Sequence, residues 1–127
     1  MSEAVVAGLW IGPRLSTMQQ LCIRSFIAHG HPFHLYAYED VQGVPPGTIL
    51  RDGREILPED AIFRYGSRFG QGSPAAFANL FRYQLLLEHG GWWSDLDMVC
   101  LKPLRFAEAY VFGQQYRPDG SATTLHR

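Results

Sequence analysis

The chain has 127 residues, the length of a single domain, with 46% hydrophobic and 18% charged residues. These proportions are those of a folded globular protein and exclude a disordered chain. A formal net charge of −1 and the lack of a long basic run give no electrostatic attraction to nucleic acid. We therefore expect no nucleic-acid partner.

The amino terminus and the cysteines favour a cytoplasmic location. The apolar run near the start is too short for an export signal or a membrane span, and no charged segment precedes it. Cys22 and Cys100 fall in expected core elements, which favours buried reduced thiols; the alternative is a disulfide between them. We expect no membrane span within this chain.

The first third of the chain has the pattern strand, helix, strand. Ala4–Ile11 is a compact apolar run closed by glycine and proline, which indicates a buried strand. A helix is expected over Ser16–His29, with a hydroxyl side chain as its cap, and a second strand over Phe33–Tyr38. This order within about 35 residues is typical of a parallel βαβ unit.

The rest of the chain adds further strands and one more helix. Thr48–Arg51 reads as a short strand, and Ser73 caps a helix expected over Pro74–His89. Tyr110–Tyr116 reads as another strand, and the polar segment Arg117–Arg127 as a frayed end. The sequence thus predicts an α/β fold: a mostly parallel sheet, the first strand central, flanked by helices.

Two aspartates interrupt an apolar run that follows a Gly90-Gly91 break. The run Trp92–Leu101 reads as a strand, in which residues two apart point to the same side, so Asp95 and Asp97 should converge. Buried acids are costly without a compensating cation. Hard oxygen ligands suit Mg²⁺ or Mn²⁺ that carries a diphosphate. The pattern therefore indicates a metal site; the alternative is a surface turn with a chance Asp-x-Asp.

A family resemblance rests on these residues, taken in order: Arg82 on a leucine-rich helix, Gly90-Gly91, Trp93, Asp95-x-Asp97 and Lys102-Pro103. About a quarter of the chain thus resembles the nucleotide-sugar-binding core of glycosyltransferases with a DXD sugar-binding region. That group includes α-1,4-galactosyltransferase-like and yeast α-1,6-mannosyltransferase-like enzymes and, distantly, the glucosylating clostridial toxins. The resemblance implies a GT-A-type, Rossmann-like fold and a metal-dependent, retaining hexosyltransferase of polysaccharide biosynthesis. It implies a UDP-sugar donor and a saccharide or protein acceptor.

The resemblance also implies roles for individual residues. Asp95 would contact the ribose and the sugar, and Asp97 would bind the Mn²⁺ or Mg²⁺ that bridges the diphosphate, so both are the expected catalytic residues. Trp10 with Ile11 closes the first strand as Trp-Ile-Gly, and relatives with this signature stack the indole on uracil. The alternative for Trp10 is a core tryptophan. Trp93 is expected to pack the floor of the cleft.

The helix before the glycine pair carries the remaining donor-binding candidates. Relatives carry Asp-x-x-Arg there, the acid on the donor sugar and the arginine on the sugar or phosphates. In this chain the pair is Asn79 and Arg82, one turn apart. Asparagine can still accept a hydrogen bond but carries no charge. The alternative for Arg82 is an ion pair with an acid such as Glu88. The Glu39-Asp40 pair after the second strand is expected to contact the donor or a loop.

Two rival interpretations remain open. Relatives place acceptor-binding residues well beyond the acid pair, whereas about 30 residues follow Asp97 in this chain. We therefore expect one nucleotide-sugar-binding domain over residues 1–127, incomplete on its C-terminal side, that keeps some donor affinity but transfers slowly or not at all. The alternative is a degenerate or non-catalytic binding domain. A haloacid-dehalogenase-type phosphatase is the other rival, but its Asp-x-Asp normally follows the first strand. The five histidines lack zinc-site spacing and are expected to be structural.

Overall fold

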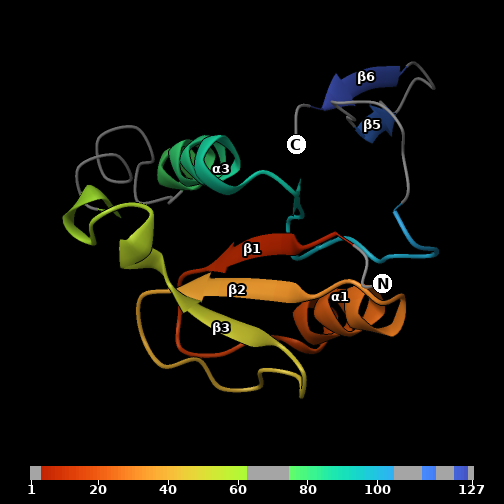
Figure 1. Ribbon diagram of the computed structural model, residues 1–127, viewed down its shortest axis with the longest axis horizontal. Coiled ribbons are helices and arrows are strands. Elements are labelled where there is room, and N and C mark those ends of the chain that lie inside the picture. The colour runs from red at the N-terminus through yellow and green to blue at the C-terminus, as the bar shows by residue number, and fades with distance from the viewer. Residues whose placement is uncertain (1–3, 63–74, 105–112, 117–121, 126–127) are drawn as a thin grey trace.

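A computed structural model describes residues 4–62, 75–104, 113–116 and 122–125 (Figure 1). Three of its elements are helical and six are strands among these residues. In chain order they are β1 (Val6–Trp10), α1 (Thr17–Ala28), β2 (Phe33–Ala37), β3 (Ile49–Asp52), the 3₁₀ helix η1 (Gly53–Glu55), α3 (Ala75–His89), β4 (Trp92–Trp93), β5 (Gly113–Tyr116) and β6 (Ala122–Leu125).

Four strands form a parallel sheet in the order β3-β2-β1-β4. All five residues of β1 pair with β2, from Val6 opposite Phe33 to Trp10 opposite Ala37. On its other edge, β1 pairs with the two residues of β4. The α/β class, the parallel sheet and the interior position of the first strand are therefore confirmed. The arrangement is consistent with the expected Rossmann-like GT-A fold.

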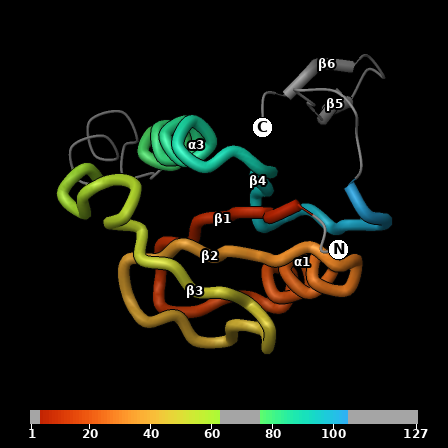
Figure 2. The backbone as a smooth tube through the Cα atoms, in the orientation of Figure 1, coloured from red at the N-terminus to blue at the C-terminus, as the bar shows by residue number. Residues whose placement is uncertain are grey.

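Helices cover both faces of this sheet, α1 on one side and α3 on the other (Figure 2). Successive strand residues point to opposite faces, so each strand contributes to two cores. Val6 and Leu35 are buried with α1 in one cluster, the α1-side core. Ala7 and Tyr36 are buried with α3 in the other, the α3-side core.

The local sequence explains the limits of α1. Ser16 is the N-cap, and its hydroxyl accepts from the backbone N–H of Gln19, whose side chain in turn accepts from the Ser16 backbone N–H. His29 is the C-cap. The helix expected over Ser16–His29 is thus confirmed. Its buried face consists of Cys22, Ile23 and Phe26.

A buried aromatic stripe and a pair of glycines define α3. Phe77, Phe81 and Leu85 follow one another at four-residue spacing and are almost fully buried. Gly90 and Gly91 have φ of 68° and 83°, a left-handed conformation that ends the helix as expected. The predicted cap Ser73 and first residue Pro74 lie outside the described residues.

The C-terminal strands form a separate pair. Part of the strand expected over Tyr110–Tyr116 is present as β5, and residues 110–112 lie outside the described residues. β5 pairs antiparallel with β6, from Gly113 opposite Leu125 to Tyr116 opposite Ala122. The prediction that Arg117–Arg127 is frayed was therefore wrong over β6. Two adjacent threonines in β6 favour a strand despite the polar composition of the segment.

Candidate functional site

The strand order places one edge of the sheet where α/β proteins bind ligands. From β1 the chain adds β2 and β3 on one side, and then crosses through α3 to add β4 on the other. Ligands of open α/β sheets lie beyond the carboxyl ends of the strands where the order reverses, here between β1 and β4. Trp10 is the last residue of β1, and Asp95 comes two residues after β4. Both therefore flank the switch point, as expected.

The acids do not lie in a strand. β4 ends at Trp93, and residues 96 and 97 form a turn inside an irregular segment, Ser94–Cys100, which we call the acid loop. The strand expected over Trp92–Leu101 is confirmed only at Trp92–Trp93 and was wrong beyond Trp93, so strand alternation does not align the two acids. The reason is packing, because Leu96 and Cys100 turn into the α1-side core and bend the chain away from the sheet.

The exposure of the side chains in the acid loop changes along this bend. Leu96 and Cys100 are 8% and 6% exposed, whereas Met98 and Val99 between them are 41% and 47% exposed. Asp95 is half-buried and Asp97 is exposed. The acid loop therefore buries two apolar anchors and presents the second aspartate to solvent.

A buried tryptophan orients the first aspartate. The Trp93 indole N–H donates to Asp95 Oδ1 at 3.0 Å. Its ring is 8% exposed and packs on Phe81 of α3, with the ring centroids 6.3 Å apart. Trp93 thus has a packing role, and its N–H also restrains a carboxylate, a contact that no sequence pattern indicates.

The second aspartate lies near a buried thiol on α1. The Cys22 Sγ donates to the Asp95 carbonyl oxygen at 3.5 Å. Burial raises the pKa of the Cys22 thiol above its ordinary value, and the negative charge of Asp97 adds to the rise. The pKa of Cys100 is also raised by burial. Both cysteines are free and buried, which confirms the prediction of reduced thiols.

Trp10 and Ile11 lie on opposite sides of the sheet. Trp10 is half-buried and packs against the α1-side core, the cluster that holds Leu96 and Cys100 of the acid loop. Its buried Nε1 has no hydrogen-bond partner among the described residues. Ile11 packs against the α3-side core. The structure thus brings Trp10, but not Ile11, onto the packing unit that supports the acids.

Arg82 is a buried cation without a counter-ion among the described residues. It is 9% exposed, its buried Nε has no hydrogen-bond partner, and its guanidinium carbon lies 4.8 Å from the centroid of the Tyr83 ring. The ion pair with Glu88 considered above is not formed, since the ion pairs of the described residues involve Arg51 and Arg54. Burying an unpaired charge is costly, so this arrangement suits an anionic ligand.

Asn79 occupies the exposed side of α3 one turn before Arg82. The first half of this helix lies over the carboxyl end of the sheet, because Phe77 packs on Tyr38 immediately after β2, with centroids 5.8 Å apart. No described contact joins Asn79 or Arg82 directly to the acids. The connection between α3 and Asp95 runs through Trp93, which packs on the helix.

A cavity of about 570 Å³ opens at the carboxyl ends of β2 and β3. Ala37, the register partner of Trp10, forms part of its wall, and Val41 belongs both to the wall and to the packing around the α1-side core. The exposed pair Glu39-Asp40 lines it as well. The cavity therefore adjoins the end of β1, on the side away from the acid loop.

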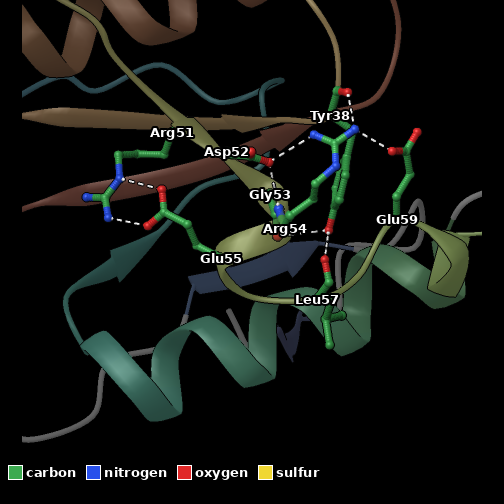
Figure 3. A network of polar contacts seen from close by, with 8 residues as sticks. All are labelled: Tyr38, Arg51, Asp52, Gly53, Arg54, Glu55, Leu57 and Glu59. Carbon is green, nitrogen blue, oxygen red and sulfur yellow. Dashed lines mark hydrogen bonds and ion pairs between the residues drawn. The ribbon is translucent and has the colours of Figure 1, made fainter.

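A polar network fixes the rim of this cavity (Figure 3). The Tyr38 hydroxyl lies 3.0 Å from the Gly53 carbonyl oxygen and 2.8 Å from that of Leu57. Arg54 donates to the Tyr38 carbonyl oxygen at 3.2 Å and forms ion pairs with Asp52 and Glu59. The backbone N–H and guanidinium of Arg54 lower the pKa of Asp52, and burial raises the pKa of Tyr38.

No motif in the sequence predicts this network. Its one usable signal was the four-residue spacing of Arg51 and Glu55, which form an ion pair at 2.6 Å. The side chain of Arg54 folds back over the Tyr38 ring, 5.7 Å from its centroid, and no local pattern indicates that contact.

The described residues contain no cluster of three histidine, cysteine or acidic side chains that could hold a metal by themselves. Asp95 and Asp97 would supply two carboxylates at most. Magnesium-type ions are commonly bound by one or two carboxylates, with phosphate oxygens and water completing the shell. The donor set thus fits a metal that arrives with a diphosphate.

Comparison with known families supports the resemblance. Residues 68–117, about two-fifths of the chain, match the family described as "Glycosyltransferase sugar-binding region containing DXD motif". The matched segment includes Asn79, Arg82, Asp95 and Asp97, and leaves Trp10 outside it. No curated protein and no solved structure matches the chain. No described helix is long and apolar enough to cross a membrane.

Proposed function

On the premise that residues 68–117 form a glycosyltransferase sugar-binding region, we propose that this chain binds a UDP-hexose and serves its transfer to an acceptor. One observation carries the proposal. Asp95 and Asp97, within the matched segment, follow the carboxyl end of β4, which pairs with β1 at the switch point of a parallel sheet. That edge is where a nucleotide would bind in such a fold.

The nucleoside end of the donor fits the β1–β2 side of this edge. The cavity there has a volume within the range of small-molecule sites. The half-buried indole of Trp10 offers a flat, rigid surface for a pyrimidine ring. Exposed carboxylates of Glu39 and Asp40 can accept hydrogen bonds from ribose hydroxyls.

The diphosphate end fits the α3 side. Arg82 keeps a buried guanidinium whose Nε–H has no partner among the described residues, and a phosphate oxygen would satisfy it. Hydrogen bonds between guanidinium and phosphate are short and strong because both groups are charged. Arg82 would therefore hold the leaving group of the reaction.

A divalent cation, Mn²⁺ or Mg²⁺, would bind between the diphosphate and the acid loop. Asp97 is exposed and free to reach it, while the Trp93 indole fixes the orientation of Asp95. When bound, such a cation neutralises the negative charge that grows on the departing diphosphate. Both acids are then catalytic through the leaving group rather than through proton transfer.

The proposal also specifies the reaction. The hexosyl group of the UDP-hexose is transferred, with retention of configuration, to a saccharide or protein acceptor, and UDP is the leaving group. Asn79 would meet the sugar of the donor, and its amide can both donate to and accept from sugar hydroxyls. Its lack of charge favours the alternative, a non-catalytic domain that binds the nucleotide sugar without transferring it.

Calorimetry with UDP, in the presence and absence of Mn²⁺, tests donor binding. We expect Mn²⁺ to tighten UDP binding by about tenfold or more, equal to about 1.4 kcal/mol. Asp97→Asn should abolish that gain, whereas Glu88→Gln, an exposed change elsewhere on α3, should preserve it. UDP affinity that is the same with and without Mn²⁺ would argue against the metal role of the acid loop.

Release of UDP from a UDP-hexose separates the enzyme from its alternatives. A transferase releases UDP, and faster when a suitable acceptor is present; a phosphatase hydrolyses a generic phosphate ester with Mg²⁺ alone. Tight binding without release would support the non-catalytic domain. In that case Asn79→Asp, which restores the acid that relatives carry, should generate measurable release.

A further inference from the structure

We propose that Ser25 and Cys22 of α1 are positioning residues for the acid loop. They hold its backbone so that Asp95 and Asp97 can bind the metal and the donor. The inference rests on the proposed function and extends it to residues outside the matched family segment, which starts at residue 68.

Ser25 anchors the far end of the acid loop. Its Oγ accepts a hydrogen bond from the Cys100 backbone N–H at 2.8 Å and donates to the Cys22 carbonyl oxygen at 2.6 Å. Cys100 lies outside any strand, so a sheet partner does not satisfy its N–H. The serine hydroxyl, held by its own helix, takes the place of that partner.

Cys22 anchors the near end of the loop. It lies three residues before Ser25, on the same side of α1, and is fully buried. Its Sγ donates to the carbonyl oxygen of Asp95 at 3.5 Å, and the Ser94 hydroxyl donates to the same oxygen at 2.8 Å. The backbone of the first acid is thus fixed independently of its side chain.

The exposed acid lies between these two anchors. The loop starts where the Ser94 N–H donates to the Ala7 carbonyl oxygen at 3.0 Å, and it ends at the bond to Ser25. Asp97 and its two following neighbours project between them into solvent. The position of Asp97 is therefore set by the two fixed ends of the acid loop and by the buried Leu96. A metal site that is ordered in advance binds its ligand at a smaller entropic cost.

A separate contact keeps the chain in place after the loop. The His31 Nε2 accepts from the Leu104 N–H at 2.9 Å, while its Nδ1 lies 2.7 Å from the Ala4 carbonyl oxygen. Loss of the Ser25 hydroxyl should therefore loosen the loop without detaching the segment that follows. This separation makes the role of Ser25 measurable.

The test compares Ser25→Ala with Ser16→Ala in the full chain. Both changes remove a serine hydroxyl that accepts a hydrogen bond from a backbone N–H. The donor to Ser25 is Cys100 of the acid loop, whereas the donor to Ser16, the cap of α1, is Gln19 of the same helix. We expect Ser25→Ala to weaken Mn²⁺ binding to the UDP complex about three- to tenfold, the equivalent of one hydrogen bond. Ser16→Ala should change the Mn²⁺ affinity by less than about twofold.

Two further measurements exclude a general loss of stability. In the metal-free protein, amide hydrogen exchange at Cys100 should become about three- to tenfold faster in Ser25→Ala and stay unchanged in Ser16→Ala. Ser25→Thr keeps the hydroxyl and should retain near-normal Mn²⁺ affinity. Cys22→Ala removes the other anchor and should weaken Mn²⁺ binding as Ser25→Ala does, which provides a second variant if the first fails to fold.

The outcomes separate the two proposals. Unchanged Mn²⁺ affinity and unchanged exchange at Cys100 in Ser25→Ala would overturn the positioning role, as would equal losses in Ser25→Ala and Ser16→Ala. Absence of Mn²⁺-dependent UDP binding in the unmodified protein would instead overturn the proposed function. Exchange at Cys100 would still show in that case whether Ser25 orders the loop.

Discussion

Replacement of Arg82 by methionine should stabilise the protein and weaken its ligand binding at the same time. The guanidinium is 9% exposed, and its buried Nε has no partner among the described residues. An unsatisfied buried donor costs about 1–3 kcal/mol. Methionine has a similar helix propensity and a similar length but no polar hydrogen.

The expected gain is smaller than that cost, because the cation–π contact with Tyr83 is lost as well. Tyr83 is 57% exposed, so this contact contributes about 0.5–1 kcal/mol. The net increase in the free energy of unfolding should be about 0.5–2 kcal/mol, which raises the melting temperature by several degrees. Urea denaturation measures the first quantity and thermal melting the second.

Binding should change in the opposite direction. A charged hydrogen bond to a phosphate contributes about 1.5–3 kcal/mol, so UDP should bind about 10- to 150-fold more weakly to Arg82→Met. Arg82→Lys keeps the charge but loses the planar guanidinium, so its UDP affinity should lie between those of the unmodified protein and Arg82→Met. Destabilisation of Arg82→Met by more than about 1 kcal/mol, with unchanged UDP affinity, would refute the reasoning and make Arg82 a structural residue.

Three other expectations follow from the same contacts. Trp93→Phe keeps an aromatic ring against α3 but deletes the N–H that orients Asp95, so Mn²⁺-dependent UDP binding should weaken by up to about 1.5–3 kcal/mol in calorimetry; unchanged binding would mean that this bond has no role. Trp10→Ala should weaken UDP by about 1–3 kcal/mol, the range for a base stacked on an aromatic ring, whereas an effect on folding alone would indicate a core tryptophan. Above about pH 8.5 the unfolded chain loses thiol protons that the folded chain retains, because burial raises the pKa of Cys22 and Cys100. Stability should therefore fall with rising pH, by up to about 1.4 kcal/mol per pH unit for each thiol, and Cys22→Ala should flatten the slope in urea denaturation between pH 8 and 10; an identical slope in that variant would contradict the assignment.

The fold was predictable because its signals are local. The helix over Ser16–His29 has a cap and an apolar face, and α3 has an aromatic stripe that ends at two glycines with positive φ. Such patterns specify an element before any tertiary contact forms. The strand β6 was missed because its polar residues gave no alternation, and its pairing with β5 is a contact between separate segments.

The site was predictable in its residues but not in its shape. Asp95 and Asp97 were identified from a motif, yet their geometry depends on Leu96 and Cys100, which leave the sheet for a core that other segments build. The anchors on α1 are more than 70 residues away in sequence, and their hydrogen bonds leave no local pattern. Likewise, the lack of a partner for the Arg82 Nε among the described residues is a consequence of packing around the helix, which spacing alone does not indicate.

Nuclear magnetic resonance of the tryptophan indoles tests the central claim, that one donor spans the end of β1 and the acid loop. The chain has three tryptophans, so the ¹H–¹⁵N spectrum should hold three indole signals. UDP should shift the Trp10 signal, and substoichiometric Mn²⁺ added with UDP should broaden the backbone amides from Asp95 to Val99 first. A UDP-induced shift at Trp10 without broadening at the acid loop, or broadening that is the same without UDP, would contradict a shared site.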